Sequence, residues 1–84
     1  MPLYYFHFAV GRKRYPDELG VQFDSVEAAY LDAFRAAEEM WIELIKKGED
    51  PTTGSFEICD TNGDLLLILP FKEVLKPVRK PPLS

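Results

Sequence analysis

The pattern of apolar residues near the N-terminus predicts strands. Residues 3–10 are rich in aromatic side chains, which favour strands, and their even-numbered positions point to one side while the odd-numbered positions point to the other. Residues 13–15 follow a glycine turn and are expected to return as a short strand, which Pro16 ends because proline cannot donate to a ladder. Residues 21–23 alternate again and indicate a further short strand.

A long helical period follows. We expect a helix near residues 25–47, where nothing breaks the pattern and Gly48 follows the last turn. Asp24 or Ser25 can cap its N-terminus, and Asp24 with Glu27 has the spacing of a capping box. One broad face is apolar and is the expected core face; it carries Val26, Ala29, Tyr30, Ala33, Ala37, Met40, Trp41 and Leu44.

The C-terminal half contains a hairpin signal, because residues 56–60 and 65–69 are apolar and flank Asn62-Gly63. A two-residue turn would set Ile58 opposite Leu67 and Phe56 opposite Leu69, with Cys59 and Leu66 on the other surface. A three-residue turn with a bulge would instead set Cys59 opposite Leu65. We expect the first register, because it aligns the large apolar side chains against the helix; these are Phe56, Ile58, Leu65, Leu67 and Leu69.

The order of these elements predicts an α+β fold, a ββαββ antiparallel sheet with one long helix packed on one face. We expect a single α+β domain over residues 1–75 and a flexible, basic, Pro-rich tail over residues 76–84.

One helix covers only one face of a sheet, yet the first and last strands are apolar on both sides. Such a face is rarely left in water, so we expect self-association, most simply as a two-fold homodimer. The competing cover is the tail, through Val78 and Leu83, and an unidentified protein partner is a further alternative. The candidate self-association surface consists of Leu3, Tyr5, Leu31, Ile42, Leu66 and Ile68.

Charge is unevenly distributed along the 84 residues, whose formal net charge is −4. Residues 1–14 carry +3, residues 15–71 carry −10, and the residues from Lys72 onward carry +3. An acidic chain suits a phosphate backbone poorly, so nucleic-acid binding is not expected. The alternative is a nucleic-acid-binding or antitoxin-like regulator that uses the two basic clusters, with contacts from Arg12, Lys13, Arg14, Arg79 and Lys80.

The chain offers little catalytic chemistry. His7 is the only histidine and Cys59 the only cysteine, so a zinc site with four such ligands is not expected, and both residues are interpreted as structural. The turn that begins at Asp60 lacks the glycine and glutamate of a calcium loop. We therefore expect no enzyme, no cofactor, no metal site and no catalytic residue.

Localisation follows from similar features. A lone cysteine fits a reducing cytoplasm, no signal peptide is apparent, and the longest apolar run is too short to cross a membrane. We expect a cytoplasmic protein with no membrane association.

Several motifs occur together in a recognisable order: Tyr5-Phe6-His7, Pro16-Asp17-Glu18-x-Gly20, Glu27-Ala28-Ala29 to Ala36-Ala37-Glu38, Phe56-Glu57-Ile58-x-Asp60-x-x-Gly63 and Pro70-Phe71-x-x-Val74-Leu75. In these motifs the chain resembles a family of small uncharacterised bacterial proteins abundant in rhizobia and related alphaproteobacteria. That resemblance implies no established activity, catalytic residue or cofactor. A second likeness, at the level of the fold, is to antitoxin-type HicB domains, which also place a Ser-x-Glu-Ala helix after a hairpin; it rests on Ser25-Val26-Glu27-Ala28-Ala29.

Overall fold

The structure, a computed structural model, describes residues 1–74. The tail expected over residues 76–84 lies outside the described residues, as do Arg79, Lys80, Val78 and Leu83. The elements in chain order are β1 (Leu3–Val10), β2 (Lys13–Tyr15), β3 (Val21–Gln22), α1 (Val26–Lys46), a 3-10 turn η1 (Pro51–Thr53), β4 (Ser55–Cys59), β5 (Leu65–Pro70) and a second 3-10 turn η2 (Phe71–Glu73).

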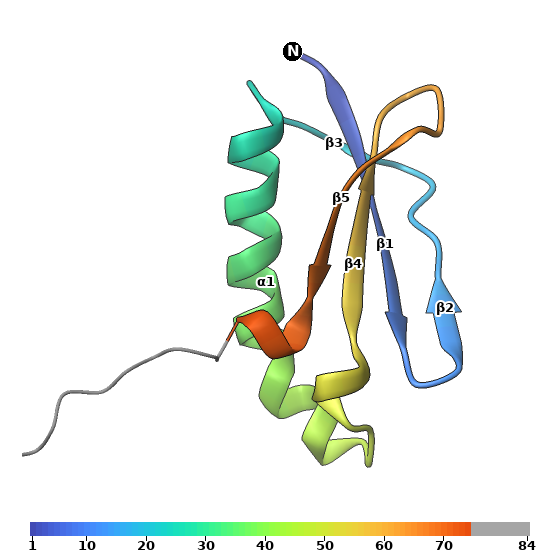
Figure 1. Cartoon of the computed structure of the whole chain (residues 1–84), viewed down its shortest axis with the longest axis vertical. Helices are drawn as coiled ribbons and strands as arrows, with labels where there is room; N and C mark the ends of the chain where they lie inside the picture. Colours follow the sequence, from blue (N-terminus) through green and yellow to red (C-terminus); the bar gives the residue numbers. More distant parts are fainter. Residues whose placement is uncertain (75–84) are drawn as a thin grey trace, which may run out of the picture.

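All strands belong to one antiparallel sheet in the order β2-β1-β4-β5, and β3 also pairs with β1. The helix α1 runs beside β5 and packs on one face of this sheet (Figure 1). The predicted α+β class, with one antiparallel sheet and one long helix, is confirmed. The short strand indicated near residues 21–23 adds a fifth strand to the predicted ββαββ order.

The helix begins and ends close to the predicted residues. Ser25 is the N-cap in an extended conformation, and its hydroxyl accepts a hydrogen bond of 3.2 Å from the Ala28 N–H. The predicted pairing of Asp24 with Glu27 as a capping box is wrong, because with Ser25 as the cap the third helical position is Ala28, which has no carboxylate. Gly48 adopts a φ of 82° just after the helix, as a terminating glycine does.

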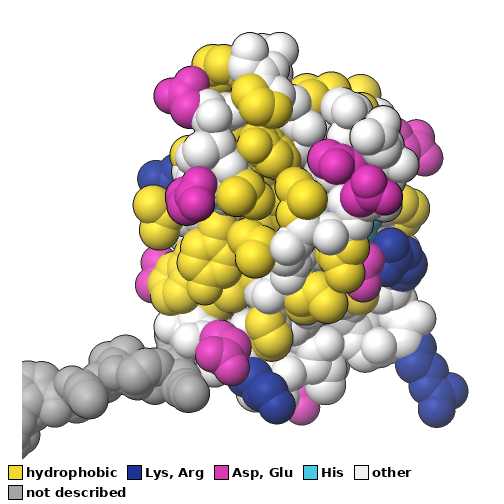
Figure 2. All heavy atoms as spheres, turned by 45° about the horizontal axis from the view of Figure 1, so that its top comes forward, with side chains coloured by type: hydrophobic (Ala, Val, Ile, Leu, Met, Phe, Trp, Pro, Cys, Tyr) yellow, Lys and Arg dark blue, Asp and Glu magenta, His cyan; other side chains and the backbone are white. Residues whose placement is uncertain are grey.

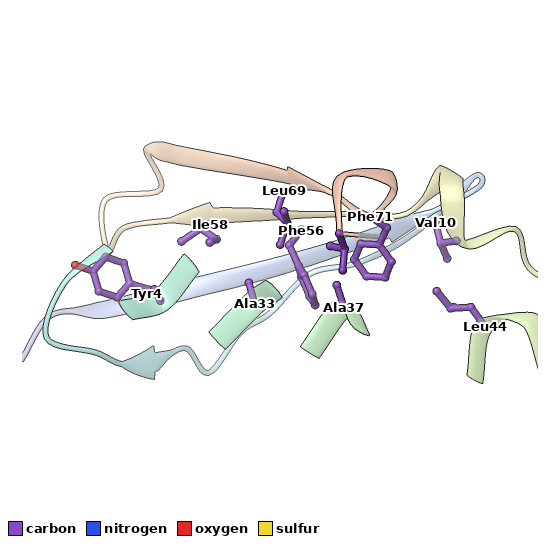
Figure 3. Packing of buried hydrophobic residues seen from close by; sticks show 11 residues of the cluster. Tyr4, Val10, Ala33, Ala37, Leu44, Phe56, Ile58, Leu69 and Phe71 are labelled. Carbon is purple, nitrogen blue, oxygen red and sulfur yellow. The ribbon is translucent and has the colours of Figure 1, made fainter. Parts of the chain in front are cut away.

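The core lies between α1 and the sheet (Figure 3). Ala29, Ala33 and Ala37 are buried on the helix, and their small side chains let the helix approach the strands closely. The largest fully buried side chains come from the sheet side: Phe71, Ile58, Leu69 and Val10. The predicted core face of the helix is confirmed, since its other members are buried or pack against this cluster.

The turn of the C-terminal hairpin differs from the expected two-residue turn. The Asp60 carboxylate accepts hydrogen bonds from the Asn62 N–H at 2.9 Å and the Asp64 N–H at 3.0 Å, and the Asp60 N–H donates to the Asp64 carbonyl. Asp60 therefore pairs with Asp64, and the turn holds three residues with Gly63 at a φ of 85°. Cys59 consequently lies opposite Leu65, so the predicted register at this end was wrong.

A β-bulge next to the turn restores the register farther along the hairpin. The register shifts between Ile58 and Cys59, after which Ile58 pairs with Leu67 and Phe56 with Leu69, as predicted. The bulge turns Leu65 away from the core, so this side chain is 52% exposed instead of packing against the helix.

Candidate interaction surface

The two edges of the sheet differ in how far their backbone groups are paired. The edge along β1 is largely protected from pairing with another chain. The two short strands β2 and β3 pair with opposite ends of β1. Between them, the Asp17 carboxylate accepts a hydrogen bond of 3.1 Å from the Phe6 N–H. Because a side chain takes the place of the missing strand, β1 does not present a row of free donors to another chain.

Asp17 is fixed by several bonds at once. Its second carboxylate oxygen accepts from the Leu19 N–H at 3.1 Å and the Gly20 N–H at 3.2 Å, and the Asp17 N–H donates to His7 Nδ1 at 3.0 Å. Burial raises the pKa of this carboxyl, but the hydrogen bonds from Phe6, Gly20 and Leu19 and the nearby His7 outweigh it, so the pKa is lowered overall.

The same loop covers part of the second sheet face, which the sequence left without a cover. Gly20 has a φ of 74°, and a Cβ atom there would lie 3.0 Å from Leu3 Cγ and 3.1 Å from Tyr5 Cε2. Leu3 and Tyr5 are accordingly half-buried within the monomer. Of the six residues in the candidate surface, these two are therefore the least available to a partner.

The opposite edge is formed by β5, which within residues 1–74 pairs with β4 alone. Its six residues, Leu65 to Pro70, include no charged side chain. Leu66 and Ile68 are 40% and 52% exposed, and both had been predicted to lie on a self-association surface. An exposed apolar edge strand can pair with a strand of another chain, and proteins usually prevent this with charged residues, bulges or short edge strands.

The helix presents different side chains to the two edges of the sheet. Its flank toward β2 is acidic and carries Asp32, Glu39 and Glu43 at helical spacing. Glu43 lines a hollow of about 500 Å³ together with Lys13 and Tyr15 of β2. Phe8, Val10, Met40 and Leu44 also line this hollow, so this side of the molecule combines apolar and charged side chains.

The flank toward β5 is mainly apolar, although Glu27 lines the groove there and helical spacing places Glu38 on the same flank. Trp41 on this flank stacks on Phe71, which follows β5 directly, with ring centroids 6.5 Å apart. Helical spacing places Tyr30, Leu31, Phe34 and Ile45 on the same flank. Figure 2 shows apolar side chains gathered in a continuous area on the side of the molecule where α1 and β5 lie.

A groove joins this helix flank to the strand. It has a volume of about 560 Å³ and is lined by Val26, Glu27, Tyr30, Leu31 and Leu67. Leu31 is 67% exposed at its rim. Leu31, Leu66 and Ile68 are thus brought to one edge of the molecule, which we call the β5 edge surface.

Ile42, the remaining member of the predicted set, is exposed on α1 eleven residues beyond Leu31, and this spacing of three turns places both side chains on the same side of the helix. Leu67 packs against the core beside the helix, as predicted, and also lines the groove. Leu65 was predicted to face the helix but is exposed, because the structure adopts the bulged register that the sequence offered as the alternative.

The basic cluster near the N-terminus is largely neutralised. Lys13 Nζ lies 2.9 Å from a carboxylate oxygen of Glu49, and an Arg14 guanidinium nitrogen lies 3.0 Å from one of Glu57. The hydrogen bond and charge of Glu49 raise the pKa of Lys13. Two of the three cations of this N-terminal cluster therefore already face carboxylates, and the third is Arg12.

His7 and Cys59 lie near each other on neighbouring strands. Tyr5 pairs with Cys59 and His7 pairs with Glu57, and a small hollow of about 220 Å³ is lined by both His7 and Cys59. The pKa of the Cys59 thiol is raised, first by burial and then by Glu57, Asp60 and Asp64, with Arg14 opposing. This arrangement disfavours the thiolate that nucleophilic catalysis requires.

We therefore predict that Cys59 reacts slowly with thiol reagents. In the folded protein at pH 7, alkylation by iodoacetamide is expected to be at least about tenfold slower than that of glutathione, because a buried thiol with a raised pKa is neither accessible nor ionised. Adding denaturing urea should bring the two rates together. A fast reaction in the folded protein would contradict the structural interpretation of Cys59.

Within residues 1–74, no group of three or more histidine, cysteine, aspartate or glutamate side chains is arranged to hold a metal ion. The same part of the chain has no helix that is both long and apolar enough to span a membrane.

The comparisons with known proteins identify a family but no function. One family model, described as a domain of unknown function (DUF6894), matches residues 3–72. The resemblance to a family of uncharacterised proteins is confirmed at this level. No curated protein and no solved structure matches the chain.

Proposed function

We propose that this chain, which belongs to the DUF6894 family, is a small non-catalytic interaction module that associates with a second copy of itself. The observation that carries the proposal is the β5 edge surface, where an apolar strand that within residues 1–74 pairs with β4 alone lies beside a mainly apolar helix flank. Burying apolar area stabilises association by about 25 cal/mol per Å² before the costs of binding are subtracted.

The polar chemistry of the described residues supports a non-catalytic role. The best-positioned carboxylate, Asp17, is committed to three backbone donors, and Asp60 is committed to its own turn. The one thiol has a raised pKa. These groups stabilise the fold, and none of them is poised to transfer a proton or attack a substrate.

Sedimentation equilibrium or light scattering over a range of micromolar concentrations tests the proposal. We expect a mass near twice the 9.6 kDa of one chain, with dissociation on dilution. Leu66→Glu should shift the protein to the monomer, because pairing would bury an unpaired carboxylate. Leu19→Glu is the matched control, because Leu19 is 86% exposed in the loop on the opposite edge.

A monomeric mass for the unmodified protein across that range would contradict self-association. A dimer that survives Leu66→Glu but not Ile42→Glu would keep self-association and move it from β5 to the side of the helix that carries Leu31 and Ile42.

A further inference from the structure

We infer that two copies pair through their β5 strands, antiparallel and in one register, with Ile68 of each copy opposite Ile68 of the other. This inference rests on the proposed self-association and adds the surface and the geometry. The two five-stranded sheets would then form one continuous sheet, with the two-fold axis passing through its centre.

The hydrogen-bonding directions along β5 select this register. The Phe71 N–H donates to the Gly54 carbonyl at 2.9 Å, so it points toward β4. Because these directions alternate along a strand, Leu69 and Leu67 also bond toward β4, while Ile68 directs its N–H and C=O away from the sheet.

Leu66 and Pro70 cannot serve as the centre of a hydrogen-bonded pair, and a centre at Leu67 or Leu69 would require Ile68 to bond with Leu66 or Pro70 of the partner. Pro70 has no N–H to donate, and Leu66 lies in the bulge, where the alternation is interrupted. Ile68 is therefore the one position of this strand at which two copies can exchange both hydrogen bonds with the same residue of the partner.

Charge is complementary in an antiparallel pair. Asp64 lies just before β5 and Lys72 just after it, so the end of β5 that carries Asp64 comes beside the end of the partner's β5 that carries Lys72. No charged residue lies between Leu65 and Pro70. A parallel pair would instead bring like charges together at both ends.

The side chains beside the strand also fit a second copy. A two-fold axis perpendicular to the sheet places both α1 helices on the same face, on either side of the junction between the β5 strands. The flank of α1 that faces this junction is the mainly apolar one, where Tyr30 and Leu31 line the groove together with Glu27. On the other face, Leu66 of each copy extends the apolar contact.

The first test removes only the outward N–H. Ile68→Pro keeps the bonds toward β4, because proline is tolerated where the N–H of an edge strand faces solvent, but it cannot form the central pair. We expect Ile68→Pro to be monomeric and Ile68→Val, which retains the N–H and the branched side chain, to remain dimeric. Circular dichroism of both variants verifies the fold. A folded Ile68→Pro that stays dimeric would overturn the inference.

The second test does not depend on proline being accommodated. In a Cys59→Ser background, Ile68→Cys should form an interchain disulfide under mild oxidation, because opposed residues of a hydrogen-bonded pair have Cα atoms about 5.5 Å apart, within disulfide range. Leu66→Cys is the control and should remain reduced, because Leu66 of one copy would lie opposite Pro70 of the other.

The two proposals fail in different ways. An unmodified protein that is monomeric removes both. A dimer that cross-links through Leu66→Cys, or through neither cysteine, retains self-association and overturns this register. Cross-linking through Ile68→Cys alone, together with a monomeric Ile68→Pro, supports it.

Discussion

Replacing Phe71 by alanine is expected to lower the free energy of unfolding by about 3–5 kcal/mol, the range typical of large-to-small changes in a core. Phe71 is fully buried and is the largest such side chain among the described residues. Its ring centroid lies 5.4 Å from that of Phe56 and 5.5 Å from that of Phe8, and it stacks on Trp41. Its loss would leave a cavity at the point where helix, sheet and η2 meet.

Urea denaturation followed by circular dichroism measures this effect. Glu73→Ala is the matched control, because Glu73 is exposed in the same 3-10 turn and should change stability by less than about 0.5 kcal/mol. Since small domains are stable by only about 5–15 kcal/mol, Phe71→Ala could be substantially unfolded at 25 °C. Equal stability of the two variants would contradict the central position of Phe71 in the core.

The position of Phe71 could be predicted only in part from the sequence. Leu67, Leu69 and Phe71 continue a period of two on one face, but Pro70 marks the expected end of the strand. The missing information is tertiary, because Phe71 packs against Gly54, where a Cβ atom would lie 3.0 Å from the Phe71 ring. The sequence shows a glycine in a loop, but it does not show which aromatic ring packs against that glycine.

The helix was the most predictable element, because its signals are local. Its cap, its uninterrupted apolar face and its terminating glycine all lie within the helix or next to it. The hairpin was less predictable, because two turns of different length fit the same Asn62-Gly63 sequence and the Asp60 side chain selects between them. The bulge then shifts the register by one residue, so that Ile58 pairs with Leu67 and Phe56 with Leu69 despite the three-residue turn.

The candidate surface was likewise predicted only in part from the sequence. The sequence indicated that apolar residues exceeded what one helix could cover, and Leu66, Ile68 and Leu31 are indeed exposed in the monomer. Which sheet edge remains open could not be predicted, because the protection of β1 depends on a loop that folds back so that Asp17 meets the Phe6 N–H. Leu3 and Tyr5 are partly covered by that same loop.

That loop supplies the second large effect: Asp17→Asn is expected to lower the free energy of unfolding by about 1–3 kcal/mol at pH 7. The amide retains one acceptor oxygen. Its NH₂ group takes the place of the other carboxylate oxygen, which in the unmodified protein accepts hydrogen bonds from backbone N–H groups. Either the Phe6 N–H or the pair from Leu19 and Gly20 would lose its partner. Glu18→Gln removes the same charge from the exposed neighbour and is the matched control.

The pH dependence of the free energy of unfolding distinguishes the contribution of the Asp17 charge from that of its packing. Because the folded-state pKa of Asp17 is lowered, its stabilisation is complete above the unfolded-state pKa of about 3.9 and is lost as the pH falls through the folded-state value. We therefore expect the difference between the unmodified protein and Asp17→Asn to be largest near neutral pH and to shrink below about pH 4. Urea denaturation at stepped pH values measures it. A difference that stays constant down to pH 2 would show that the carboxylate contributes through packing alone, whereas a shrinking difference identifies the ionised Asp17 as the group that closes the β1 edge.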